Sequence, residues 1–300
     1  MKPLGKRIAM AVVCAATLTS PLLLSGCSMS ELWQGTEQSR KEIAQRSEQD
    51  QVQLFNQYVK AVSRFNRMAV MFDYANTPTL NGLKAGQHLT VFNTPNFKQL
   101  QKELEEAKQA GIPYDEMKEP LDKLLSKLNE ITPVAEELDA YYKSKGYTTD
   151  NYAKEQQLGP KYVQLYEQFI PIYADFDNIM HKINTDRLQQ RLQQLRDAGK
   201  KNAAAAQEIS LRLTAVLEKL DSEKQPDVNA INQELQAIGD LANSISSPTY
   251  DSVKTSVNST IGAIRTYMGS KQDNDYKHMV EAYNRYISNM NTTNMNELDQ

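Results

Sequence analysis

An apolar period of three and four residues runs through most of this chain and restricts the fold to helices. Its clearest instance recurs on one face of a long helix, at Val52, Phe55, Tyr58, Val59, Val62, Phe65, Ala69 and Phe72. No segment shows the sustained alternation of apolar and polar residues that a half-buried strand requires. The sequence therefore predicts an all-α fold, an elongated multi-helix bundle.

Glycine and proline residues divide this pattern into separate helices. We expect Asn76-Thr77-Pro78 to end the first helix and residues 76–96 to form the longest irregular connection, a favourable position for a functional loop. Further helices are expected at 97–110, 115–145, 152–184, 186–222, 227–246, 249–269 and 275–291. The helical domain thus covers residues 49–291, and the tail 292–300, rich in Asn and Thr, is expected to be disordered.

One aromatic pattern occurs three times. Residues 52–59 (VQLFNQYV), 163–170 (VQLYEQFI) and 280–287 (VEAYNRYI) each place a valine, two aromatic residues and a β-branched residue on one helical face. Core packing explains the pattern simply, because large aromatic side chains dominate core energetics. A duplicated unit, with similar halves at 49–150 and 151–291, is the alternative.

Residues 1–27 have the parts of an export signal. Lys2, Lys6 and Arg7 form a positive start, residues 8–24 are mostly apolar, and Leu24-Ser25-Gly26-Cys27 resembles the bacterial lipobox. The pattern predicts cleavage between Gly26 and Cys27, removal of the signal peptide 1–26, and lipidation of the Cys27 thiol. A chance cysteine in an ordinary signal peptide is the alternative.

Lipidation would determine where the protein resides. Each buried methylene contributes about 0.8 kcal/mol, so two or three chains of the palmitate class on Cys27 would hold the protein on a membrane. Ser28, in place of an aspartate, favours the outer membrane of a Gram-negative cell, facing the periplasm. Residues 27–48 are rich in Gln, Glu and Ser, and we expect a flexible tether there.

Three segments resemble a known family. Phe55-Asn56-x-Tyr58-Val59, Tyr283-Asn284-x-Tyr286-Ile287 and residues 140–154 (AYYKSKGYTTDNYAK) are similar to the YiiG-like bacterial lipoproteins, a domain of unknown function, over about residues 50–290. The resemblance implies a helical lipoprotein of the cell envelope. It supplies no catalytic residue.

Residue types that carry chemistry are sparse. The three histidines, His88, His181 and His278, are far apart, and neither a zinc-protease motif nor a nucleophile elbow nor a phosphate loop is present. Asp177 and His181 share one helical face and could contact a metal, although a simple helix interaction explains them better. We therefore expect no enzymatic activity, no cofactor and no metal. The formal net charge of −3 argues against nucleic acid as a partner.

Two functions remain open. The first is a membrane-anchored helical scaffold or binding module that contacts other envelope proteins. The second is a ligand-binding or hydrolytic domain for a glycan, a peptide or a metal. It would use a cleft between the two helical halves, lined by Asn56, Tyr58, Tyr142, Tyr147 and Asn284. Convergence of these five side chains in one exposed pocket would support the second function.

Overall fold

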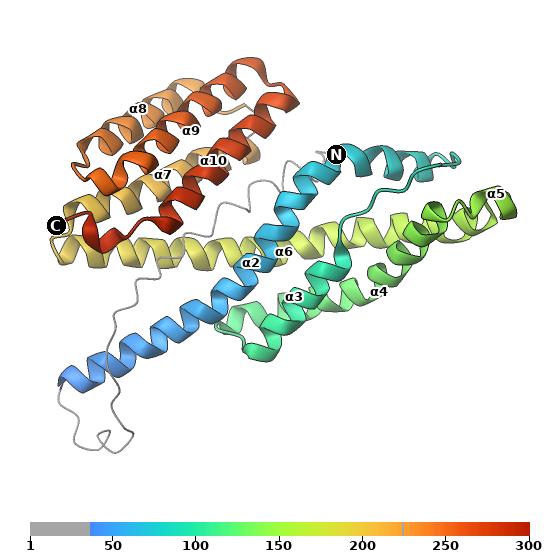
Figure 1. Ribbon diagram of the computed structural model, residues 1–300, viewed down its shortest axis with the longest axis horizontal. Helices are drawn as coiled ribbons and strands as arrows, with labels where there is room; N and C mark the ends of the chain where they lie inside the picture. The colour runs from blue at the N-terminus through green and yellow to red at the C-terminus, as the bar shows by residue number, and fades with distance from the viewer. Residues whose placement is uncertain (1–36, 224) are drawn as a thin grey trace.

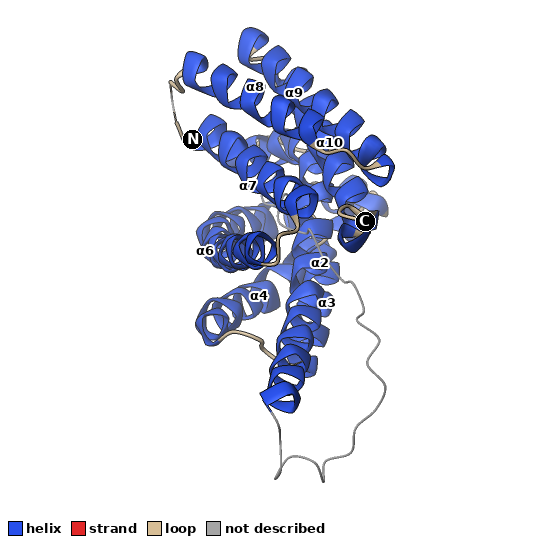
Figure 2. Ribbon diagram, turned by 90° about the vertical axis from the view of Figure 1, so that its left-hand side faces the viewer, coloured by secondary structure: helices blue, strands red, loops and turns tan. Residues whose placement is uncertain are grey.

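The computed structural model describes residues 37–223 and 225–300, with the side chains of residues 50–66, 78–223 and 225–300. This part of the chain is helical and contains no strand, which confirms the predicted all-α multi-helix bundle (Figures 1 and 2). Gly26, Cys27 and the predicted signal peptide lie outside the described residues. Among the described helices, none is long and apolar enough to cross a membrane.

Nine α-helices and three short 3-10 turns follow one another along the described chain. They are α2 (Glu37–Lys84), α3 (Phe97–Ala110), η3 (Asp115–Met117), α4 (Lys118–Lys143), α5 (Tyr147–Asp150), α6 (Ala153–Asp197), α7 (Lys201–Ser222), α8 (Val228–Ser244), η4 (Pro248–Tyr250), α9 (Asp251–Ser270), α10 (Asp273–Thr292) and η5 (Met295–Glu297).

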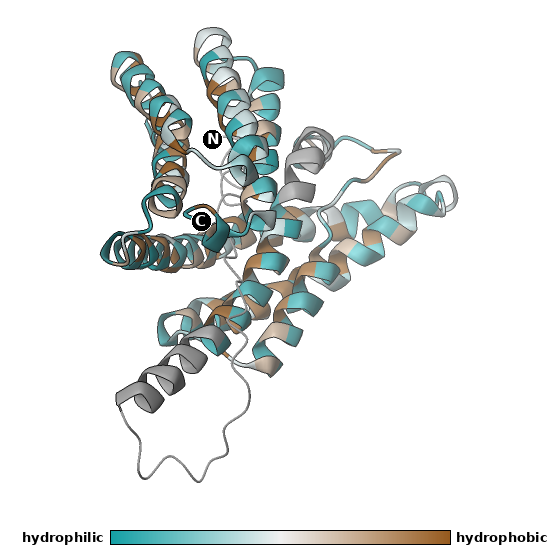
Figure 3. Cartoon of the chain, turned by 60° about the vertical axis from the view of Figure 1, so that its left-hand side comes forward, coloured by the Kyte–Doolittle hydropathy of each residue, from teal (hydrophilic) through white to brown (hydrophobic). Residues whose placement is uncertain are grey.

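Two hydrophobic cores share the long helix α6. The first core lies among α2, α3, α4 and α6, and reaches as far as Ile183. The second core begins at Leu192 on the same helix and continues through α7, α8, α9 and α10. We call these two parts the first and second bundles (Figure 1). In both, the hydrophobic residues gather on the faces that the helices turn toward one another (Figure 3).

The division between the cores differs from the predicted halves 49–150 and 151–291. It falls within α6, because neither glycine nor proline interrupts the chain between Pro171 and Gly199. The predicted helix break near residue 185 is absent for the same reason. The chain turns instead at Gly199, whose φ of +68° lies in the left-handed region that glycine adopts easily.

The first helix also differs from its predicted bounds. Helix α2 continues through Pro78 to Lys84, so the predicted stop at Asn76-Thr77-Pro78 is wrong. Gly86 ends the helix, with φ of +64°, and the N–H of Gln87 donates back to the Gly82 carbonyl at 2.9 Å. At its other end α2 begins at Glu37, within the segment 27–48 that was expected to be a flexible tether. The Glu, Gln, Lys and Arg residues of that segment are good helix formers.

The C-terminal tail, expected to be disordered, is ordered. Met295 and Leu298 are buried in the second core. The carboxylate of Asp299 accepts hydrogen bonds from the backbone N–H groups of Asn202 and Ala203, at 2.7 and 3.0 Å. These N–H groups lie in the first turn of α7, whose N-cap residue provides no side-chain hydrogen bond. The tail therefore supplies the missing cap.

The three aromatic copies lie on α2, α6 and α10, and their aromatic side chains are all buried. The first two copies contribute to the first core and the third to the second core. This distribution supports core packing as the origin of the pattern.

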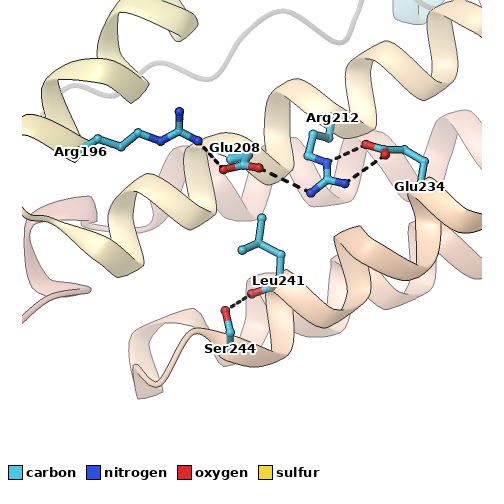
Figure 4. A network of polar contacts seen from close by, with 6 residues as sticks. All are labelled: Arg196, Glu208, Arg212, Glu234, Leu241 and Ser244. Carbon is cyan, nitrogen blue, oxygen red and sulfur yellow. Dashed lines mark hydrogen bonds and ion pairs between the residues drawn. The ribbon is translucent and has the colours of Figure 1, made fainter.

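An ion-pair network joins three helices on the surface of the second bundle (Figure 4). Arg196 of α6 and Arg212 of α7 both contact Glu208, at 2.7 and 3.5 Å. Arg212 also binds Glu234 of α8 through two hydrogen bonds of 2.6 and 3.0 Å. This bidentate geometry favours one relative position of α7 and α8.

Candidate interaction site at the tip of the first bundle

Two segments distant in sequence meet at one end of the first bundle. One is the loop 85–94 that follows α2. The other is residues 144–153, which contain α5 and comprise the connection between α4 and α6 together with the first residue of α6. We call these two segments, together with Tyr142 and Glu155, the tip. The tip lies at the opposite end of the first bundle from the N-terminal end of α2 (Figure 1).

The carboxylate of Glu155 joins the parts of the tip. This side chain, in the first turn of α6, is 5% exposed. It accepts hydrogen bonds from the backbone N–H of Leu89, at 3.0 Å, and from the hydroxyl of Tyr142 at the end of α4. His88 Nδ1 lies 2.8 Å from its other oxygen. A buried carboxylate is tolerated only when it is hydrogen-bonded or paired, so these contacts fix the loop against both helices.

Aromatic rings fill the space between the two segments. The ring of Tyr152 stacks between His88, at 4.0 Å, and Tyr147, at 5.2 Å between ring centroids. Beneath this stack, Tyr142 stacks on Phe92 at 5.5 Å. Burial raises the pKa of Tyr142 well above its usual value, and the hydrogen bond to Glu155 raises it further. Tyr142 is therefore a neutral hydrogen-bond donor at physiological pH.

The backbone of the tip adopts strained conformations. Asn151 and Tyr152 are consecutive residues with φ of 52° and 65°, a region that a bulky residue such as tyrosine rarely adopts. Conformations of this kind cost about 1–3 kcal/mol each and cluster at functional sites. Asp150 supports this turn, because its carboxylate accepts hydrogen bonds from the Tyr141 hydroxyl, at 2.7 Å, and from the N–H of Lys154, at 3.1 Å. The bond from Tyr141 is also the main cause that lowers the pKa of Asp150.

The outer surface of the tip is poor in charge. Residues 85–94 contain no Asp, Glu, Lys or Arg, and residues 144–153 contain only Lys145 and Asp150. Val91, in the loop, is 63% exposed. Protein interfaces are depleted of charged residues and enriched in aromatic residues at their centre. The tip is depleted of charged residues and contains the half-buried rings of Tyr147 and Tyr152, and the Glu155 contacts hold its loop 85–94 in place.

The structure brings together two of the five residues predicted to line a cleft. Tyr142 and Tyr147 lie in the tip, with 6.1 Å between their ring centroids. Tyr58 is buried near the start of α4, where its hydroxyl donates to the Gly111 carbonyl at 2.9 Å, and burial raises its pKa to about 12. Helix α4 has 26 residues and so separates Tyr58 from Tyr142 by about 35 Å.

The other two predicted residues lie elsewhere again. Asn56 is half-buried near Tyr58, and Asn284 belongs to α10 in the second bundle. The five side chains therefore do not line one cleft. The physical reason is that the cores divide within α6, which separates Asn284 from the other four residues.

Sequence reasoning missed several residues of the tip. The loop 76–96 was expected to be functional, and the family-like segment 140–154 contains Asp150 and Tyr152. No sequence pattern, however, indicated Glu155, because its partner His88 lies 67 positions earlier in the chain. A glutamate in the first turn of a helix usually serves the helix dipole alone.

The predicted Asp177 and His181 pair lies where α6 passes between the two bundles. Burial raises the pKa of Asp177 to about 7, while His181 and Asn66 act in the opposite direction. His181 also pairs with Glu218 of α7. Within the described residues, no group of three or more His, Cys, Asp or Glu side chains is placed to hold a metal ion.

Comparison with known proteins places the chain in a family. Residues 49–294 match a family described as a protein of unknown function (DUF3829), over more than half of the chain. No curated protein and no solved structure shows significant similarity to this chain. The chain thus belongs to the DUF3829 family.

Proposed function

We propose that this protein is a non-enzymatic, lipid-anchored module of the cell envelope, a YiiG-like lipoprotein that binds a partner protein through its tip. The observation that carries the proposal is the tip itself, a charge-poor surface that contains the half-buried rings of Tyr147 and Tyr152 and whose loop 85–94 is held by the buried Glu155. Because this surface carries little charge, we expect the partner to present a similarly charge-poor surface. Binding of this kind depends weakly on salt.

The lipobox supports the anchor. In this proposal Cys27 is acylated and the protein faces the periplasm from the outer membrane. Ten residues separate Cys27 from Glu37, a distance of at most about 35 Å. Helix α2 has 48 residues and spans about 70 Å, so an anchor at its N-terminal end leaves the tip well away from the lipid headgroups. The tip would then be presented to proteins at a distance from the membrane.

The chemistry of the tip supports binding over catalysis. A general acid or base needs access to substrate and a pKa near the working pH. The Glu155 side chain is buried and engaged by Leu89, Tyr142 and His88, and the pKa of Tyr142 is raised, away from neutrality. These groups serve the architecture of the loop.

Photo-crosslinking from single positions in living cells tests the proposed surface. A photoreactive residue at position 91, in the tip, is compared with one at position 228, where Val228 is 42% exposed on α8. We expect a discrete adduct with one envelope protein from position 91 and none from position 228. An additional substitution, Gln87→Lys, adds a charge within the loop and should weaken that adduct.

Two results would count against the proposal. Equal labelling from positions 91 and 228 would show that the tip has no particular partner. Recovery of the Cys27→Ser variant in the membrane fraction, as for the unchanged protein, would contradict the anchor. The Cys27→Ser variant also tests whether the adduct from position 91 requires membrane attachment.

A further inference from the structure

Five rings of the tip form a continuous series of contacts that runs from the first core to the surface. Phe92 stacks on Tyr142 at 5.5 Å between ring centroids, and Tyr142 lies 6.1 Å from Tyr147. Tyr152 stacks between Tyr147, at 5.2 Å, and His88, at 4.0 Å. Exposure increases along this ring series, because Phe92 and Tyr142 are buried, Tyr147 and Tyr152 are half-buried, and His88 is exposed. His88 is therefore its outermost member.

The His88 ring has one covered face and one open face. Tyr152 covers the inner face, since the planes of the two rings lie only 16° apart. The His88 side chain nevertheless remains 48% exposed, which leaves its outer face to solvent. Its Nδ1 lies 2.8 Å from the buried Glu155 carboxylate, and this contact fixes the orientation of the ring. The ring series thus ends in a flat, fixed and open π surface.

A neutral aromatic ring suits this surface better than a charged side chain. Aromatic rings stack on one another in offset arrangements, and aromatic residues are enriched among the residues that carry binding energy in protein interfaces. An arginine can also stack, but it gains most when a carboxylate pairs with it. The only carboxylates of the tip belong to Asp150 and Glu155, and hydrogen bonds within the tip already engage both.

We propose that the open face of His88 receives an aromatic side chain of the partner protein, which extends the ring series by one ring. This inference rests on the function proposed above and names the side chain that the tip recognises. His88 contacts the partner directly, whereas Glu155 positions His88. Because the ring is already fixed, its stacking on the partner costs little side-chain entropy.

Histidine NMR of the full chain tests the open face without the partner. The neutral aromatic probe N-acetyltryptophanamide is added to protein with isotope-labelled histidine, and the Cε1–H signal of His88 is identified by its loss in a His88→Asn variant. We expect a saturable upfield shift of this signal, caused by the ring current of the stacked probe. His278, exposed on α10 of the second bundle, is the matched control and should shift less. Equal shifts at the two histidines would overturn the proposal.

Competing probes test the chemistry of the partner's side chain. N-acetylleucinamide and N-acetylargininamide, each added at the same concentration as the tryptophan derivative, should leave the shift of His88 unchanged. Competition by the leucine derivative would indicate a general apolar surface, and competition by the arginine derivative would indicate a cationic partner. Either result would overturn the assignment of an aromatic side chain.

Two substitutions separate the ring of His88 from its contact with Glu155. His88→Phe keeps a ring at the end of the series and removes the contact, whereas His88→Asn keeps a donor for the carboxylate and removes the ring. The adduct from position 91 should fall about two- to twelvefold in His88→Asn, the worth of one aromatic pair, and less in His88→Phe.

The order of the two variants decides between the two roles of His88. Equal yields or the opposite order would overturn the proposal, since the ring would then make no contribution of its own. If the unchanged protein forms no adduct from position 91, the proposed function fails instead. The titration with N-acetyltryptophanamide still decides in that case whether the face of His88 binds an aromatic ring.

Discussion

Removing the Glu155 carboxylate should release the loop 85–94 from the tip. In a Glu155→Ala variant the Tyr142 hydroxyl, which is buried, loses its acceptor, at about 1–3 kcal/mol. The Leu89 N–H lies in a half-buried segment and can turn to water, so its lost bond adds about 1 kcal/mol. Together these losses destabilise the closed loop by about 2–4 kcal/mol, equivalent to an increase in its opening constant of about 30- to 1000-fold.

Glu155→Gln should have a smaller effect. A glutamine carbonyl oxygen can still accept from Leu89 and Tyr142, but hydrogen bonds to a neutral acceptor are about half as strong as those to a carboxylate. We expect a loss of about 1–2 kcal/mol. Hydrogen exchange of the amides in residues 85–94, followed in the intact chain, measures both variants against the unchanged protein.

Glu167→Ala is the matched control. Glu167 also lies on α6 and pairs with Lys84 of α2 at 2.6 Å, but both side chains are solvent-exposed. An exposed ion pair contributes about 0–1 kcal/mol, so the control should alter loop opening by at most about fivefold. If Glu155→Ala resembles Glu167→Ala in the exchange of residues 85–94, the assignment of Glu155 as the residue that holds the tip is wrong.

Three further predictions concern other parts of the chain. Leu298→Ala should lower the stability of the second bundle by about 2–5 kcal/mol, because it leaves a cavity in a core that the tail completes; unchanged thermal unfolding would argue against an ordered tail. Gly146→Ala should destabilise the tip, since its Cβ would lie 2.6 Å from the Tyr141 ring, and unaltered exchange of residues 144–153 would refute this. The folded chain holds the Asp177 proton more tightly than the unfolded chain, so this group's stabilising contribution should fall as the pH rises from 3.8 toward about 7. Urea midpoints of the unchanged protein and Asp177→Asn, measured across that range, should diverge, and parallel profiles would contradict the raised pKa of Asp177.

The sequence predicted the helices well and their ends less well. Apolar periodicity is a local property, and it placed α3, α8, α9 and α10 within a few residues of their observed bounds. The predicted end of the helix at Pro78 was wrong because proline removes only one helical hydrogen bond. Packing of Leu83 against the first core stabilises the helix beyond that point. Gly86, not Pro78, carries the left-handed conformation that ends the helix.

The tip and the tail depend on contacts between distant residues. Tyr142 and Tyr147 were predicted as site residues, and they are close together because one short connection holds both. Glu155 has its partners on a loop and on another helix. Contacts of this kind produce no regular spacing in the sequence from which they could be predicted. Asp299 caps α7 across almost a hundred residues for the same reason. Contacts of this kind follow from the packing of whole helices, which periodicity alone does not determine.

The shared helix α6 also orders events during synthesis. Domains form from the N-terminus as the chain emerges, and the first core needs no residue beyond Ile183. Once α6 is complete, its distal part carries Leu188, Leu192 and Leu195, and the helices of the second core that cover them have not yet been made. The next segment to emerge, α7, follows after only three residues, so it reaches these leucines before α8, α9 or α10. We therefore expect the second bundle to nucleate on the unfinished end of the first, and chains truncated within 201–222 to aggregate through the uncovered leucines.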